Sequence, residues 1–143
     1  MRKAAILAAL AAAGLAEVAS AQGRAPGQPP AFQIFFDWGK PEVTRDAAPI
    51  LDAAVTAFLQ DPRAKLQLSG HSDRSGAAGG NRRSALKRAE AVRDYLAARG
   101  VPREAMVLAS FGEERPLVAT EDGVREVHNR RVEIRFGDNG SPR

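Results

Sequence analysis

The segment GHSDRSGAAGGNRRSALKR, residues 70–88, joins a strand pattern to a helix pattern and carries a distinctive set of polar groups. Its glycines and serines predict a loop at the strand end. The set comprises a carboxylate (Asp73), a hydroxyl (Ser75), an amide (Asn81) and a guanidinium (Arg88). Asp73 and Arg88, held near one another but not bonded, can bind the ammonium and the carboxylate of one amino acid. The alternative is a structural salt bridge between them, which the spacing alone favours.

On either side of this loop, strand and helix patterns follow one another. The expected strands are Phe32–Phe36, Lys65–His71, Met106–Phe111 and Arg131–Phe136. Two helices are expected, one capped by Asp46 and ended by Asp61-Pro62, the other running from Asn81 to Arg99. The order β-α-β-α-β-β predicts an α/β fold, a two-layer sandwich in which both helices cover one face of a mixed four-stranded sheet.

Alternation within two strands predicts which side chains face the helices. In the strand at 65–71, the apolar set is Leu66, Leu68 and Gly70, and the polar set is Lys65, Gln67 and Ser69. In the strand at 131–136, the apolar set is Val132, Ile134 and Phe136, and the polar set is Arg131, Glu133 and Arg135. Because successive side chains of a strand point to opposite faces, the polar sets are expected on the outer face of the sheet.

The N-terminal residues are typical of a secretory signal peptide. Arg2 and Lys3 precede an apolar run that ends in Ala19-Ser20-Ala21, so we expect residues 1–21 to be removed. The alternative is a retained anchor, although the run is shorter than the roughly 20 residues that a membrane span needs. The remaining divisions are a linker rich in proline and glycine at 22–31, the domain at 32–137 and a disordered tail at 138–143. No membrane span is expected in the mature chain.

The composition excludes several classes of site. The chain has 143 residues, no cysteine and a formal net charge of +4. Without cysteine there is no disulfide scaffold, thiolate zinc site or cysteine nucleophile, and the charge is too small for most nucleic-acid binders. His71 and Asp73 form an H-x-D pair, but neither a third metal ligand nor a nucleophile–base pattern accompanies them. We expect no metal, no cofactor, no catalysis and no nucleic-acid partner, and we expect His71 to bond to nearby backbone.

Several motifs, taken together, resemble one known family. They are Phe36-Asp37, Gly70-His71-Ser72-Asp73, Gly76, Asn81, Arg88-Ala89, Val92, Leu96, Gly100-Val101, Phe111-Gly112-Glu113, Pro116 and Asn129-Arg130-Arg131-Val132-Glu133-Ile134. In this order and at these gaps, they resemble the OmpA C-terminal-domain family. Its members include the peptidoglycan-associated lipoproteins and the periplasmic part of the flagellar stator subunit MotB. The resemblance extends over residues 33–136.

The resemblance implies a domain that binds peptidoglycan without catalysis, through the diaminopimelate of the stem peptide. In the family, the aspartate and the arginine at the positions of Asp73 and Arg88 hold the free amino-acid end of that residue, which favours ligand binding over a salt bridge. The other site residues implied are Ser75, Asn81, Phe36, Asp37 and Arg130. The sequence departs from the family pattern at Ser72, where threonine is commoner, and at the small residues 77–80, which weaken the pre-organisation of the site.

The resemblance also implies a place in the cell. A secreted member of the family lies in the periplasm, in association with the outer membrane or the cell wall, and helps envelope integrity. The loose segment 77–80 supports an alternative function, a structural or interaction subunit that binds an envelope protein and has little or no wall binding. A second alternative is an anchored, stator-like protein, if residues 1–21 are retained.

Overall fold

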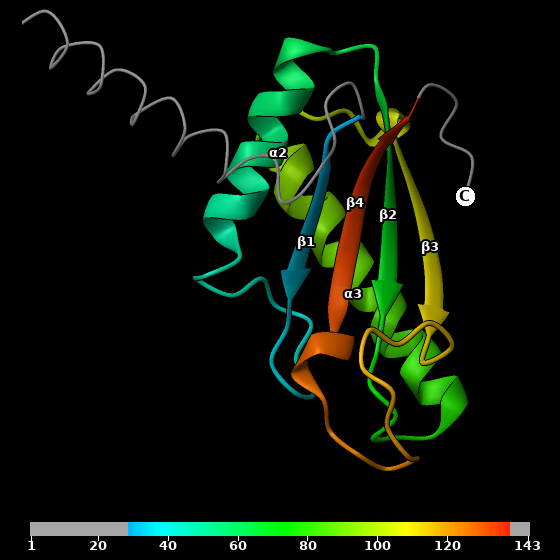
Figure 1. The fold of residues 1–143 in the computed structure, drawn as a ribbon. Coiled ribbons are helices and arrows are strands. Elements are labelled where there is room, and N and C mark those ends of the chain that lie inside the picture. Colours follow the sequence, from blue (N-terminus) through cyan, green and yellow to red (C-terminus); the bar gives the residue numbers. More distant parts are fainter. Residues whose placement is uncertain (1–28, 138–143) are drawn as a thin grey trace, which may run out of the picture.

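Four strands form a single sheet, and two long helices cover one of its faces (Figure 1). The computed structural model describes residues 29–137. The elements are β1 Ala31–Phe35, α2 Ala48–Gln60, β2 Lys65–His71, α3 Ala78–Ala98, β3 Met106–Gly112 and β4 Arg131–Gly137, with short 3-10 turns η1 Arg103–Ala105 and η2 Val127–Asn129. The expected two-layer α/β sandwich is confirmed. The expected signal peptide, most of the expected linker and the expected tail lie outside the described residues.

The strand order β1-β4-β2-β3 places the last strand of the chain between the first two. β4 pairs antiparallel with β1 and with β2, whereas β2 and β3 pair parallel, with α3 as their crossover. Since β2 and β4 are antiparallel neighbours, the end of β2 lies beside the start of β4. The loop after β2 and the segment before β4 therefore meet at one end of the sheet (Figure 1).

The core lies between the sheet and the helices. Its buried members include Ile34, Leu66, Leu68, Val132 and Ile134 from the strands and Leu51, Phe58, Ala89, Val92 and Leu96 from the helices. The apolar sets of β2 and β4 are thus where the alternation predicts them. Burial of these aliphatic side chains is the main stabilising contribution, at about 1.5–3 kcal/mol for each fully buried one.

The polar face of the sheet is more buried than its alternation predicts. Gln67, Ser69 and Arg131 point away from the core, yet their exposed fractions are 7 %, 6 % and 3 %. The loop after β3 folds across this face, and its carbonyl at Arg115 accepts a hydrogen bond from Nη2 of Arg131 (2.9 Å). The polar side chains are thus on the outer face of the sheet, as expected, and this part of the face is covered by the loop after β3.

The start of α2 differs from the prediction. Pro49 occupies the first turn of the helix, as expected, but the N-cap is Ala47 and Asp46 makes no capping hydrogen bond. The hydroxyl of Thr44 accepts a hydrogen bond from the N–H of Ala47 instead (3.1 Å). The prediction that Asp46 caps this helix was wrong, because an acceptor earlier in the chain satisfies the free donor.

The start of α3 also differs from the prediction. The helix begins at Ala78, three residues before Asn81, and includes Gly79 and Gly80. The N–H of Asn81 donates to the carbonyl of Ala77 (2.8 Å), which closes the first helical turn. Three of the four small residues that were expected to form a loose loop are therefore helical. Between residues 29 and 137, no helix has the length and apolar character needed to cross a membrane.

A Gly70→Ala substitution is expected to destabilise the domain by about 3 kcal/mol. A Cβ at Gly70 would lie 2.0 Å from the carbonyl oxygen of Ala85 in α3, so β2 and the helix would have to separate. The measurement is the free energy of unfolding in urea. The matched control is Gly79→Ala, where the nearest atom to the new Cβ is 3.7 Å away and helix propensity favours alanine. Equal stability of the two variants would contradict this close contact.

Candidate functional site

A pocket of about 250 Å³ lies between the loop that follows β2, the first turns of α3 and the turn after β1. Its lining residues are Trp38, Gly39, Ser72, Asp73, Ser75, Gly76, Ala77, Gly80, Asn81, Ser84 and Arg88. The structure therefore gathers Asp73, Ser75, Asn81 and Arg88, all predicted site residues, around one pocket. The carboxylate of Asp73, which follows β2, and the guanidinium of Arg88, from α3, line the same pocket.

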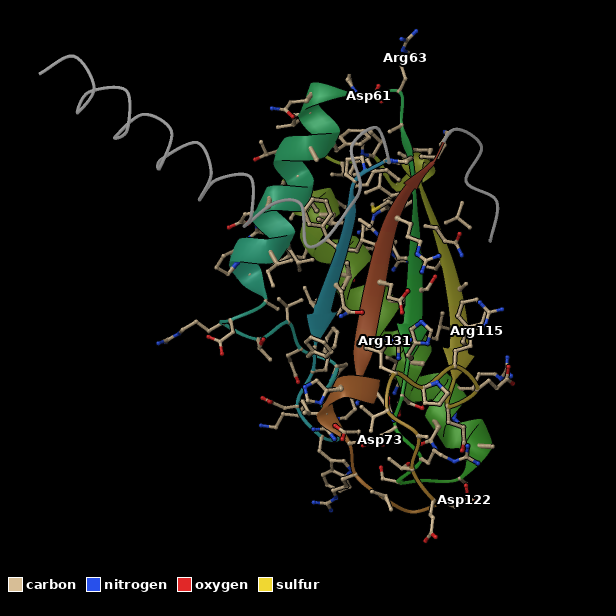
Figure 2. All side chains as sticks on the ribbon, viewed as in Figure 1. Asp61, Arg63, Asp73, Arg115, Asp122 and Arg131 are labelled. Atoms are coloured by element: carbon tan, nitrogen blue, oxygen red, sulfur yellow. The ribbon has the colours of Figure 1, made fainter. Side chains whose placement is uncertain are left out.

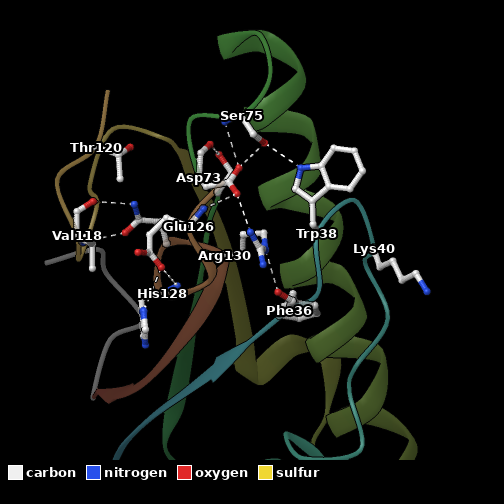
Figure 3. A network of polar contacts seen from close by, with 12 residues as sticks. Phe36, Trp38, Lys40, Asp73, Ser75, Val118, Thr120, Glu126, His128 and Arg130 are labelled. Carbon is white, nitrogen blue, oxygen red and sulfur yellow. Dashed lines mark hydrogen bonds and ion pairs between the residues drawn. The ribbon is translucent and has the colours of Figure 1, made fainter. Parts of the chain in front are cut away.

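Asp73 is buried and accepts four hydrogen bonds, as Figure 3 shows in part. Its Oδ1 accepts from the N–H (3.2 Å) and the hydroxyl (2.6 Å) of Ser75. Its Oδ2 accepts from the N–H of Glu126 (3.1 Å) and from Nη1 of Arg130 (2.8 Å). Burial raises the pKa of Asp73, but the hydrogen bonds from Ser75 and Arg130 outweigh it and lower the pKa below its usual value. Asp73 is therefore a fixed carboxylate at neutral pH.

Arg88 is buried without a carboxylate partner. Its exposed fraction is 4 %, and it forms no salt bridge with any residue from 29 to 137. It makes two long hydrogen bonds to backbone carbonyls, from Nε to Lys40 (3.5 Å) and from Nη1 to His71 (3.4 Å), and its guanidinium lies 5.7 Å from the ring centre of Phe36. Burial and the nearby charge of Arg130 lower its pKa. Arg88 thus presents a poorly compensated positive charge to the pocket.

The ion pair of Asp73 differs from the one that the sequence spacing favours. The spacing alone favoured a salt bridge between Asp73 and Arg88, whereas Asp73 pairs with Arg130, 57 residues along the chain. Arg130 also donates from Nε to the carbonyl of Phe36 (3.0 Å), so the pair ties β1 and β4 to the loop after β2. The salt bridge between Asp73 and Arg88 that the spacing alone favours is therefore wrong. The antiparallel pairing of β2 with β4 brings Arg130 to Asp73 instead.

The wall of the pocket includes a tryptophan that the sequence did not identify. Trp38 is 48 % exposed, donates from Nε1 to the hydroxyl of Ser75 (3.1 Å) and lies against the guanidinium of Arg125 (3.5 Å). A hydrogen-bonded chain thus runs from Trp38 through Ser75 to Asp73 (Figure 3). An aromatic residue in a turn after a strand was the only available indication of this role.

Asn81 supports the shape of the pocket. Its Nδ2 donates to the carbonyl of Gly76 (2.9 Å) and to Oε1 of Glu113 (3.3 Å). Both partners lie in loops, so one amide in the first turn of α3 fixes the loop after β2 against the segment after β3. Asn81 therefore positions the pocket wall as well as lining it.

Three predicted site residues, Phe36, Asp37 and Arg130, do not line this pocket. Phe36 and Asp37 border a separate hollow of about 370 Å³ between β1 and the start of α2. Phe36 still contacts the site, because its carbonyl binds Arg130 and its ring lies beneath Arg88. Asp37 is exposed. Within residues 29–137 it makes no hydrogen bond to a residue that lines the Asp73–Arg88 pocket. Phe36 is thus a supporting residue.

His71 does not bond to nearby backbone, so that expectation was wrong. Its ring lies on the opposite face of the sheet from α3, stacked on Phe111 with 5.4 Å between ring centres, and neither ring nitrogen has a hydrogen-bond partner within residues 29–137. In the same part of the chain, no three side chains among histidine, aspartate and glutamate gather closely enough to hold a metal ion. His71 belongs to the other face of the sheet.

Comparison with known proteins adds to this geometry. A sequence profile of the OmpA family matches residues 35–130. An outer membrane protein of Gluconacetobacter diazotrophicus is 34 % identical over 116 residues, which cover 77 % of this chain and 31 % of that protein. The peptidoglycan-associated lipoprotein of Rhizobium meliloti is 34 % identical over 109 residues, covering 76 % of this chain and 62 % of the relative. The chain therefore spans less than a third of the first relative's length and less than two thirds of the second's.

A solved structure with the same fold is the peptidoglycan-associated lipoprotein from Burkholderia pseudomallei. Its TM-score is 0.69 at 26 % sequence identity, and the match covers 74 % of this chain and 90 % of that one. The arrangement of the sheet and the two helices is thus that of a solved peptidoglycan-associated lipoprotein.

Proposed function

Because the chain belongs to the OmpA family, we propose that the Asp73–Arg88 pocket binds peptidoglycan through the free amino-acid end of diaminopimelate in a stem peptide. Its relatives place the protein in the periplasm, in association with the outer membrane or the cell wall. The relatives reported above are envelope proteins with no enzyme among their names, and we propose that this chain likewise acts by binding alone. One observation carries the proposal. Arg88 is buried and has no anionic partner among residues 29–137, and the charged carboxylate of Asp73 lines the same pocket.

Arg88 is suited to the carboxylate of the ligand. Its planar guanidinium can bind both oxygens of a carboxylate, and burial strengthens such a bond. The first turn of α3 contributes Gly80 and Asn81 to the same pocket, so the positive end of the helix dipole also favours an anion there. The carboxylate of the ligand therefore lies on the α3 side.

The ammonium of the ligand lies on the side of Asp73. A carboxylate offers about four acceptor positions, and protein donors fill four of them in Asp73. The hydroxyl of Ser75 is the donor that can turn away most easily, because the others are backbone N–H groups or a paired guanidinium. An ammonium that replaces this hydroxyl also disturbs the bond from Trp38 to Ser75.

A single stem peptide is expected to bind weakly. Each charge-assisted bond contributes about 1–3 kcal/mol, and part of this is lost to the ordering of the ligand. One wall polymer carries many stems, so retention of the protein depends on repeated rebinding at neighbouring sites.

Titration with a diaminopimelate-containing stem peptide is expected to change the fluorescence of Trp38 and to saturate. Trp38 is the only tryptophan of the chain, so the signal reports this pocket alone. The control ligand has lysine in place of diaminopimelate, which removes the carboxylate that Arg88 would bind. We expect it to bind at least about tenfold more weakly, since such a bond contributes 1.4 kcal/mol or more. Equal binding of the two peptides would contradict diaminopimelate recognition.

The alternative function, an interaction subunit without wall binding, loses its support from the segment 77–80. Three of these four residues form the first turn of α3, so the pocket has an ordered wall there. The absence of any saturable fluorescence change at millimolar stem peptide would restore this alternative and direct the search to an envelope protein partner.

A further inference from the structure

A second hollow, of about 240 Å³, lies on the face of the sheet opposite the helices. It is formed by the outer side chains of β2 and β4, by Phe111 and by the loop after β3. The pairing of Gln67 with Arg135 and of Ser69 with Glu133 aligns the side chains of the two strands in adjacent rows. Figure 2 shows Arg115 and Arg131 on this face. The hollow shares no lining residue with the Asp73–Arg88 pocket.

This hollow is positively charged. Three arginines (Arg115, Arg131 and Arg135) and one glutamate (Glu133) line it, which leaves a net charge of 3 − 1 = +2 when His71 is neutral. Glu133 is paired with Arg131 (2.7 Å) and with Arg135 (3.1 Å). Arg115 lies over the ring of Phe111 (3.8 Å) and has no ion-pair partner in the described part of the chain. The site can therefore accept an additional anion.

The floor of the hollow contains buried nitrogen atoms without hydrogen-bond partners. Nη1 of Arg131 and both ring nitrogens of His71 are inaccessible to solvent and lack a hydrogen-bond partner within residues 29–137. Nε2 of His71 is 3.6 Å from the nearest oxygen of Glu133, too far for a hydrogen bond. Both residues are 3 % exposed, and a buried polar atom without a hydrogen-bond partner destabilises the folded protein. A ligand that supplies oxygen acceptors would provide partners for Nη1 of Arg131 and for the one N–H of a neutral His71.

We propose that this hollow is a second binding site, one that takes a phosphate group. A phosphate offers several oxygens in a tetrahedral arrangement, which suits guanidiniums that converge from different positions, and arginine binds it with two parallel bonds. Arg131 and His71 form the floor, and the exposed Arg115 and Arg135 form the rim. The phosphate group comes either from free phosphate or from the headgroup of an envelope phospholipid, which have this chemistry in common.

The first test is a titration of the protein with inorganic phosphate at constant ionic strength, followed by the imidazole NMR signals. The chain has only His71 and His128, and His128 lies outside the hollow. We expect a saturable shift of the His71 signal and no saturable shift of the His128 signal. Burial and Arg131 hold the pKa of His71 at about 4, so bound phosphate should also raise this pKa. A linear or equal response of both histidines would mean an adventitious ion only and would overturn the proposal.

A charge variant gives the second test. Arg115→Gln removes a rim guanidinium without altering the core and is expected to weaken phosphate binding by about tenfold. The matched control is Arg63→Gln, which removes the same charge in the turn before β2, far from the hollow (Figure 2). Unchanged phosphate affinity in Arg115→Gln, or an equal loss in both variants, would overturn the assignment of the site.

Sedimentation with vesicles identifies the source of the phosphate group. The probes are vesicles of phosphatidylglycerol in phosphatidylcholine, with pure phosphatidylcholine as the control. Binding to the anionic vesicles that is lost in Arg115→Gln would show that the site takes a lipid headgroup. A saturable phosphate shift without vesicle binding would show that it takes free phosphate.

Discussion

An Arg88→Met protein is expected to lose its binding to purified sacculi while keeping or exceeding the stability of the unmodified protein. Arg88 is buried, has no carboxylate partner in the described chain and makes only long hydrogen bonds. A methionine fills a similar length of space without a charge to desolvate. Replacement of a poorly compensated buried charge by an apolar side chain is often neutral or stabilising, here by about 1–4 kcal/mol at most.

The loss of binding follows from the same feature. In the proposed complex, the guanidinium of Arg88 holds the carboxylate of diaminopimelate, a charge-assisted contact worth about 1.5–3 kcal/mol. Its removal weakens the binding of one stem by about 10- to 150-fold. Because retention in the wall depends on many weak contacts, the co-sedimentation should fall to background. The measurements are sedimentation with sacculi and the midpoint of unfolding in urea.

Arg83→Met is the matched control, because Arg83 is an exposed arginine on the same helix and does not line the pocket. It should sediment with sacculi as the unmodified protein does. If Arg88→Met binds normally, the proposed ligand contact is wrong. If Arg88→Met is strongly destabilised, Arg88 stabilises the fold, and the prediction that this variant loses binding without losing stability is wrong.

The layers of the fold could be predicted because the spacing of apolar residues within one strand or helix shows which of its faces is buried. The alternation in 65–71 and 131–136 separates the buried side chains of a strand from the others, and the spacing of Val92 and Leu96 marks the buried face of α3. Helix starts were less predictable. Asp46 has the right chemistry for a cap, but Thr44 satisfies the donor, and only the path of the chain decides between them.

The pairing within the site could not be predicted from local spacing. Arg88 and Asp73 are close in sequence, and Arg130 is 57 residues away from Asp73, yet the antiparallel pairing of β2 and β4 brings Arg130 to the carboxylate. The resemblance indicated that Arg130 belongs to the site but not which atom it contacts. Trp38 has no pattern of its own, because its contact with Ser75 depends on where the turn after β1 lies.

The burial of the outer sheet face had a similar cause. The sequence correctly assigned Arg131 and Glu133 to that face, but no local pattern shows that the loop after β3 covers it. The carbonyl of Arg115 and the ring of Phe111 enclose the polar groups of the strands there. Polar residues at alternating positions predict a face, and long-range loop contacts decide how exposed that face is.

Asp73→Asn is expected to reduce both stability and wall binding. The substitution keeps the shape of the side chain but removes the charge that compensates Arg130, whose side chain is 10 % exposed. Removal of one partner from a buried ion pair costs about 3–5 kcal/mol, a large part of the 5–15 kcal/mol that typically stabilises a domain. The urea midpoint should therefore fall, whereas that of Arg88→Met should stay the same or rise.

The pH dependence checks the cause of this loss. The folded protein lowers the pKa of Asp73 below its usual value of 3.8, so the contribution of its charge to stability is complete well above that pH. This contribution disappears as the pH falls from 3.8 through the lower pKa of the folded protein. The difference in unfolding free energy between the unmodified protein and Asp73→Asn should therefore be largest near pH 7 and shrink in acid. A difference that stays constant down to pH 2 would contradict an ionic origin.

The double variant Asp73→Asn/Arg130→Met separates folding from binding. Removal of both charges leaves neither partner of the Asp73–Arg130 ion pair without the other, so much of the lost stability should return, although Phe36 loses its hydrogen bond from Arg130. Sacculus binding should remain absent, because the ligand ammonium still has no carboxylate. If binding returned together with stability, Asp73 would act only by holding Arg130, and the ammonium would have to bind elsewhere in the pocket.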